Sequence, residues 1–309
     1  MTEILQAEAQ PRRASARRRR PFKVNGYFFF LLPGTALVLA FTLFPAVYGI
    51  WISFTNLNLG YVGSRFVGLA NYVRFFTWPD LGLVTRNTAT FVGAAVLLQV
   101  SIGLALAILL NQRVFGHRLM RSIAILPWVL PSVVVALIFA QVFSGSRLGI
   151  VNYIASLVGV GQMAWFADPA LAMSILVICS VWRGVPFSVV ILLGGLQTLP
   201  RDVYEAAIID GASAWQRFRF ITLPLLQPII LITLIMATAG ALNSLDIPLA
   251  LTGGGPGNST ELIAVSLYKQ SFFNLDVSYG ATIGTIMLIV NIVLIVCFLA
   301  VRPSKGTGE

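Results

Sequence analysis

Six long apolar stretches restrict what this sequence can fold into. Each is long enough to cross a bilayer, which takes about 20 residues. Five contain no Lys, Arg, Asp or Glu, and the fourth contains only Arg183. In lipid, backbone polar groups must be satisfied internally, so only helices or closed barrels can span. Continuous rather than alternating apolar runs favour helices. We therefore predict an all-α membrane protein with six transmembrane helices, over Tyr27–Phe54, Asn87–Leu110, Ser122–Phe143, Leu171–Leu193, Thr222–Leu245 and Val277–Val301.

Composition agrees with a chain that is mostly surrounded by lipid. Hydrophobic residues make up 57% of the sequence and charged residues 10%, whereas a soluble domain has roughly 25% charged residues. The segments between the apolar stretches leave no room for a sizeable soluble domain. We predict one membrane domain over residues 27–301, between a basic tail (1–26) and a short C-terminal tail (302–309).

The distribution of positive charge predicts the orientation in the membrane. With the N-terminus in the cytoplasm, the inside segments hold fifteen Lys and Arg and the outside loops hold five. This excess follows the positive-inside rule, so both termini are placed in the cytoplasm. Seven of these cations precede Val24. Their position against an apolar stretch indicates contact with membrane lipid and argues against nucleic acid.

Prolines interrupt several stretches and predict bends. Pro33 and Pro45 lie in the first, Pro127 and Pro131 in the third, and Pro186 in the fourth. Each removes a backbone donor and favours a kink. Such helices either line a transport path or are simply bent and packed.

One predicted cytoplasmic loop, between the fourth and fifth stretches, is amphipathic rather than apolar. Asp202 followed by Glu205 is a helix-start signature, and Ser213 followed by Gln216 is a second one. Gly211 lies between them, where a tight turn would be easiest. The pattern predicts two short helices along the membrane surface.

The same loop, residues 197–221, resembles the EAA loop of binding-protein-dependent importer permeases. The family pattern E-A-A-x3-G-x9-I-x-L-P has every fixed position filled, by Glu205, Ala206, Ala207, Gly211, Ile221, Leu223 and Pro224. The resemblance implies that this loop seats a short helix in a groove of a cytoplasmic ATPase subunit. The residues expected to couple the two subunits are Glu205, Ala206, Ala207, Asp210, Gly211, Arg217, Leu223 and Pro224. A plain capping role for Glu205 is the alternative.

Three further passages resemble the maltose and glycerol-3-phosphate type of permease, which is MalF-like or UgpA-like. They are Leu31 to Phe54, Phe66 to Tyr72, and Leu251 to Pro256. The resemblance implies a MetI-like permease fold and a sugar, polyol or glycerol phosphate as substrate. It also implies a heterodimer with a second permease subunit, two ATPase subunits and an external substrate-binding protein. ATP and Mg would be used by the ATPase partner, and this chain would bind no cofactor.

The residues themselves argue against catalysis. Gly253–Gly257 is glycine-rich but is not followed by the Lys-Ser/Thr of a phosphate-binding loop. His117 is the only histidine, so neither a Ser/His/Asp set nor a metal cluster is expected. Cys179 and Cys297 lie in apolar stretches and are interpreted as packing residues. We predict no catalytic residue, no metal and no enzyme activity.

Polar residues in or beside the apolar stretches are candidates for contact with a transported molecule: Gln141, Trp182, Arg183, Asn243, Ser244 and Asp246. A sugar needs hydrogen-bonding groups and an aromatic face, which favours Trp182 beside a polar neighbour. An ionised residue in a span is costly, so Arg183 either contacts an anionic ligand or pairs with Asp246. The alternative function is an ion-coupled secondary transporter. Such proteins tend to carry acidic residues inside their spans, and none lies in these six stretches.

Overall fold

The computed structural model describes residues 27–61, 63–112 and 117–300. The predicted tails, 1–26 and 302–309, lie outside the described residues. The chain divides into two compact units, residues 1–47 and 48–309, which are described separately. The described part of the first unit holds α1 (Tyr27–Val38), a π-helical turn (Leu39–Leu43) and the beginning of α2 (Phe44–Ser53).

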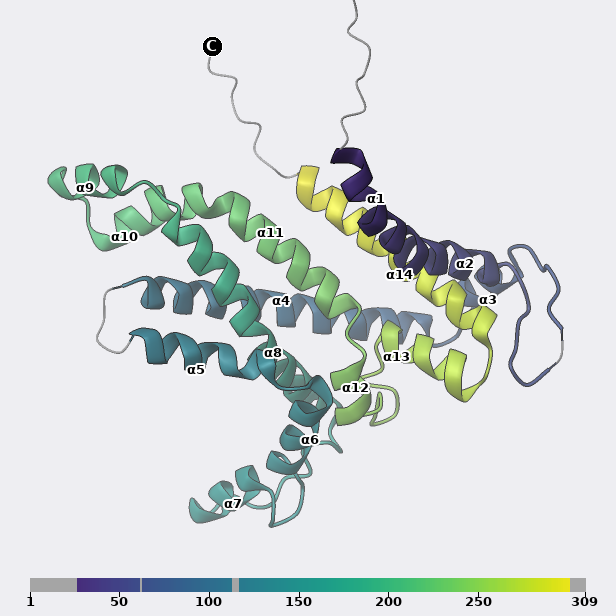
Figure 1. Ribbon diagram of the computed structural model, residues 1–309. Coiled ribbons are helices and arrows are strands. Elements are labelled where there is room, and N and C mark those ends of the chain that lie inside the picture. Colours follow the sequence, from purple (N-terminus) through teal and green to yellow (C-terminus); the bar gives the residue numbers. More distant parts are fainter. Residues whose placement is uncertain (1–26, 62, 113–116, 301–309) are drawn as a thin grey trace, which may run out of the picture. The chain divides into compact units, whose positions relative to one another are not determined.

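The second unit is helical throughout its described length. The one β pairing among the described residues is an isolated bridge between Thr55 and Phe66. The helices of this unit are α3 (Ala70–Phe76), α4 (Leu81–Asn111), α5 (His117–Val129), α6 (Ser132–Val142), α7 (Ile150–Leu157), α8 (Pro169–Gln197), α9 (Arg201–Ile209), α10 (Ala214–Arg217), α11 (Leu223–Leu242), α12 (Asp246–Leu251), α13 (Ile263–Tyr268) and α14 (Val277–Ala300). Two π-helical turns, Phe218–Thr222 and Lys269–Phe273, precede α11 and α14. The all-α prediction is confirmed (Figure 1).

The described residues contain five helices that are long and apolar enough to cross a membrane. They are Leu32–Ser53, Leu81–Asn111, Pro169–Gln197, Ala214–Leu242 and Val277–Ala300. A sixth candidate is the bent pair α5 and α6. The predicted spans therefore all correspond to helices, but most of these helices extend beyond the apolar limits by several residues.

The third predicted span, Ser122–Phe143, is not one continuous helix. Its two halves meet at 94°, with the break at Leu130 and Pro131. Proline lacks the N–H that would continue the ladder, and it disfavours the helical conformation in the residue before it. The predicted bend is confirmed at Pro131, whereas Pro127 lies inside α5 and Pro186 inside α8.

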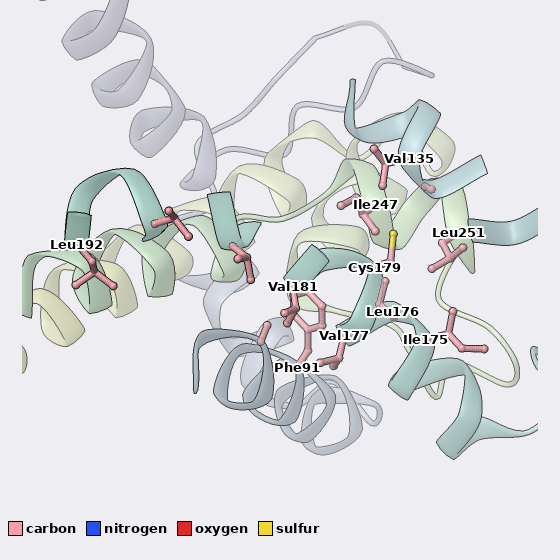
Figure 2. Packing of buried hydrophobic residues seen from close by; sticks show 14 of the residues in the cluster. Phe91, Val135, Ile175, Leu176, Val177, Cys179, Val181, Leu192, Ile247 and Leu251 are labelled. Atoms are coloured by element: carbon pink, nitrogen blue, oxygen red, sulfur yellow. The ribbon is translucent and has the colours of Figure 1, made fainter. Parts of the chain in front are cut away.

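The main core forms where α4 packs along α8. Phe91 of α4 and Leu176 and Leu192 of α8 are fully buried, and Figure 2 shows Phe91 beside Val177 of α8. A Cβ on Gly103 of α4 would lie only 2.6 Å from the Cβ of Ser188. The small residue thus lets two helices approach closely, as is typical of packing in lipid.

A compact segment that contains α12 and α13 packs against the N-terminal part of α4. Asn87 donates to the carbonyl of Asn258 at 2.9 Å, and the Thr88 hydroxyl accepts from the Ile263 N–H at 3.0 Å. The buried carboxylate of Glu261 pairs with Lys269 at 2.6 Å. The first two bonds attach the segment that follows the glycine-rich passage to α4, and the ion pair joins two residues of that segment.

Candidate coupling loop and translocation path

The first helix of the amphipathic loop, α9, ends in a turn that requires glycine. Gly211 has φ +76°, a conformation in which L side chains are strained. The Ala212 N–H donates to the Ala207 carbonyl and the Gly211 N–H to the Ile208 carbonyl, at 2.9 and 3.0 Å. This pair of bonds is the Schellman motif, which satisfies the last carbonyls of a helix. The predicted glycine turn is confirmed.

Both helices start where the sequence predicts. At α10 the Ser213 hydroxyl accepts from the Gln216 N–H, and the Gln216 side chain accepts from the Ser213 N–H. At α9 the helix begins at Arg201, one residue before Asp202, with Pro200 as its N-cap and no side-chain cap. Asp202 lies within the first turn, where its charge complements the helix dipole.

A hydrogen bond joins the loop to the residues just before α11, and another lies within the loop. The hydroxyls of Tyr204 and Thr222 share a hydrogen bond of 2.9 Å. Arg217 donates to the Ala212 carbonyl at 2.5 Å. The chain then passes through a π-helical turn into α11, whose first two residues are Leu223 and Pro224. The loop is therefore joined directly to a candidate span.

The loop presents a mixed polar and apolar surface. Glu205, Ala206, Asp210 and Gly211 are exposed, while Ala207 and Arg217 are half-buried. Large apolar side chains are exposed beside them: Ile208 58%, Ile209 86%, Trp215 65% and Phe220 69%. Monomeric proteins seldom leave such a patch uncovered, so it indicates a contact surface.

A large cavity lies between the loop and the ends of two long helices. Its volume is about 860 Å³. Asn111 and Gln112 contribute from the end of α4, and Gln197 from the end of α8. Glu205 and Arg217 of the loop face it from the other side. Polar groups thus surround the base of the coupling loop.

A second cavity, of about 280 Å³, lies among the long helices. Its lining comes from α4, α5, α8, α11 and the residues that follow α11: Phe91, Ala95, Gln99, Trp128, Ser180, Arg183, Gly184, Phe187, Met236, Ala237, Gly240, Ala241, Ser244 and Ile247. The cavity has aromatic walls and a few polar groups. Concave sites of this composition suit a small organic ligand.

Two of the six candidate path residues, Arg183 and Ser244, line this cavity. The other four point elsewhere. Trp182 packs against Phe139, with ring centroids 5.8 Å apart. Gln141 is exposed on α6, and Asn243 donates to the carbonyl of Ala239 at 2.8 Å. The sequence therefore predicted only two of the residues that line this cavity.

An ion pair between Arg183 and Asp246 was one of the two alternatives predicted for Arg183. The structure does not contain it. Ser132 donates to the Asp246 carboxylate at 2.6 Å. The two ion pairs among the described residues are Arg74–Asp276 and Lys269–Glu261. The Nε of Arg183 and the hydroxyl of Ser180 are buried without a hydrogen-bond partner. Both residues line the cavity.

Several residues that line the cavity were not predicted from the sequence. Those in α8 nevertheless follow a recognisable helical spacing. Ser180, Arg183, Gly184 and Phe187 recur at i, i+3, i+4 and i+7, which is one face of a helix. The contributions of Gln99 and Trp128 come from other helices. No local spacing connects those residues with α8.

Several apolar spans, a cavity among them and an exposed loop tied to one span define a membrane transport subunit. Residues 99–304 match the family described as binding-protein-dependent transport system inner membrane component. The chain belongs to this family. It is thus a multi-pass inner-membrane permease subunit, and such a subunit is not itself an enzyme, as predicted.

Individual relatives match nearly the whole chain. The trehalose/maltose transport system permease protein MalF of Thermococcus litoralis is 38% identical over 280 residues, covering 90% of this chain and 92% of that protein. The sulfoquinovosyl glycerol transport system permease protein SmoG of Agrobacterium fabrum is 34% identical, and each chain is 89% covered. A crystal structure of a bacterial alginate ABC transporter with its alginate-bound periplasmic protein matches with a TM-score of 0.76 at 22% identity. It covers 88% of this chain and 92% of that one, and supports the permease fold.

Proposed function

We propose that this chain is the permease subunit of an ATP-driven importer for sugars or related polyols and glycerol phosphates. It forms half of the translocation path and couples that path to a cytoplasmic ATPase through residues 197–221. The observation that carries the proposal is the α9–Gly211–α10 element, exposed on one side and tied to α11 on the other.

The substrate class is supported by the relatives and by the chemistry of the smaller cavity. Relatives at 38% and 33% identity are named for trehalose and maltose, and for lactose. In this chain, the cavity offers Trp128 and Phe187 as aromatic faces and Arg183 and Ser180 as unpaired polar groups. Stacking against a ring and hydrogen bonds to hydroxyls are how proteins hold sugars.

The partners follow from the coupling surface. The exposed Ile208, Ile209 and Trp215 need a protein groove to cover them. The charges of Glu205 and Asp210 beside them would fix the position of the loop in that groove. One chain supplies one such surface. We therefore propose a heterodimer with a second permease, two ATPase subunits that use ATP and Mg, and an external substrate-binding protein.

The proposed mechanism is a rigid-body movement driven from the cytoplasm. When the ATPase subunits close, α9 and α10 move with their groove. The Tyr204–Thr222 bond and the turn into α11 carry this movement to the helix whose Met236 and Gly240 line the cavity. The cavity would then open alternately to either side. Both termini would remain in the cytoplasm, as the charge distribution predicts.

An ion-coupled secondary transporter is the second candidate. It would need acidic side chains within the membrane to take up the coupling ion. The six candidate spans in the described residues contain no Asp or Glu. This favours coupling to ATP.

Reconstituted vesicles test the proposal. The chain is purified with its second permease and ATPase, and uptake of radiolabelled maltose, trehalose and glycerol 3-phosphate is measured. We expect uptake only with ATP inside and loaded binding protein outside, unchanged by a protonophore. Uptake driven by a proton gradient without ATP would reject the proposal.

A further inference from the structure

The segment between α6 and α8 is unusually poor in charge. The 20 residues from Leu148 to Ala167 contain no Lys, Arg, Asp or Glu, and they are flanked by Arg147 and Asp168. The short helix α7 (Ile150–Leu157) lies in this segment. Figure 1 shows α7 extending away from α4, α5 and α8.

The polar side of α7 is turned inward. Asn152 is only 1% exposed, and its amide makes every bond it can make. The nitrogen donates to the carbonyls of Ser144 and Met163, at 3.1 and 3.0 Å. The oxygen accepts from the Met163 N–H at 3.2 Å and from the Trp165 indole at 2.9 Å. The helix is thereby fixed to its own loop by its polar face.

The apolar side of α7 faces outward as a consequence. Ile150, Tyr153, Ile154 and Leu157 recur at i, i+3, i+4 and i+7, which places them in one stripe. Their exposed fractions are 54%, 59%, 56% and 69%. A helix on a water-facing loop would have the reverse arrangement, with its apolar stripe packed inward.

We propose that α7 is an interfacial anchor, with this stripe embedded at the boundary of headgroups and acyl chains. Both neighbours of the segment are candidate membrane helices, so the stripe cannot move far from the bilayer. On neighbouring α6, Val134 and Ile138 are also exposed. A tyrosine in the stripe fits this depth, because its ring is apolar and its hydroxyl reaches water.

Lipid fits the stripe better than a soluble binding protein does. No charge on the segment complements a polar protein surface, and interfaces with soluble partners carry a polar rim. Interfacial helices often hold Lys or Arg toward anionic headgroups. In α7 the polar face is used for the loop instead, so the anchor should not depend on anionic lipid. Its role is to hold the α5–α6 break and the start of α8 at a fixed depth.

Lipid contact is tested in the assembled importer, reconstituted in phosphatidylcholine nanodiscs after replacement of Cys179 and Cys297 by Ala. An environment-sensitive fluorophore is attached to Leu157→Cys on the stripe, or to Ser156→Cys as a matched control. Ser156 is also exposed, but lies off the stripe. We expect a blue-shifted emission at position 157 and quenching by spin-labelled lipid severalfold stronger than at position 156. Adding phosphatidylglycerol should change neither value.

Other occupants give different results, each of which overturns the proposal. A blue shift at position 157 that needs the binding protein would assign the stripe to that protein. A blue shift without lipid quenching, together with crosslinking to the second permease, would assign it to the subunit interface. Equal quenching at positions 156 and 157 would mean that the helix is not oriented. As a second arm, Leu157→Asp should abolish quenching of a label at Ile150→Cys, and Ser156→Asp should not.

Discussion

The turn at Gly211 allows the coupling mechanism to be tested by backbone conformation alone. Its φ is +76°, and a Cβ built on it meets no atom within 4 Å. Substitution therefore causes no steric clash, and its cost comes only from the left-handed conformation. That cost is about 1 kcal/mol for alanine and about 2 kcal/mol for a β-branched residue. Asparagine tolerates this region and should cost less.

These costs translate into a graded loss of coupling. If strain at Gly211 disfavours the loop geometry that fits the ATPase groove, about 1.4 kcal/mol reduces its population tenfold. We expect hydrolysis stimulated by loaded binding protein to fall in the order Gly, Asn, Ala, Val, with Gly211→Val lowered about tenfold or more. Gly194→Ala is the matched control, since Gly194 also has open space but lies in α8 without a positive φ.

The assay is ATP hydrolysis and substrate uptake in vesicles, with assembly checked by co-purification of the ATPase. All variants should reach the membrane. If Gly211→Val assembles and keeps normal stimulated hydrolysis and uptake, the loop does not transmit the movement. The proposed mechanism would then be wrong.

Three further outcomes are expected. Glu205→Lys should weaken both ATPase binding and stimulated hydrolysis, because it reverses an exposed charge on the loop; a purely capping role would lower helix stability and leave ATPase affinity intact. Arg183→Met should reduce uptake severalfold while the subunits still co-purify, because it removes the cavity's unpaired guanidinium; unchanged uptake kinetics would place the substrate elsewhere. Asn152→Leu should destabilise the purified subunit by about 4 kcal/mol, since it removes four hydrogen bonds of about 1 kcal/mol each; an unchanged melting temperature in detergent would contradict this value.

Features fixed by local chemistry could be predicted from sequence. The candidate spans follow from unbroken apolar runs, because lipid leaves the backbone only the helical option. The turn at Gly211 and the capping box at Ser213 follow from side chains that act on their own neighbours. The helix start expected at Asp202 is confirmed within one residue, although Pro200 is the N-cap and no side chain caps the helix.

The rotation of each span could not be predicted. A helix that is apolar all round has no periodicity to show which side faces inward. Trp182 and Arg183 are adjacent in sequence, but successive residues differ by about 100° around a helix. Arg183 consequently lines the cavity while Trp182 packs on Phe139. The cavity contributions of Gln99 and Trp128 depend on this rotation and on the packing of separate helices.

The positions of the charged residues also bear on the energy source for transport. Arg183, inside a span, has no carboxylate partner among the described residues, and Asp246 is held by Ser132. Protonation of a carboxylate in the path therefore cannot release Arg183 from an ion pair, which is how an ion gradient could drive it. The exposed acidic groups of the loop are Asp202, Glu205 and Asp210. The cavity has no acidic lining and is connected through α11 to a loop with an exposed apolar surface, which supports the proposal that a protein partner drives transport. In the proposed mechanism the work arrives as movement of α9 and α10, and the hydrogen bond between Tyr204 and Thr222 is a contact that would carry it to α11.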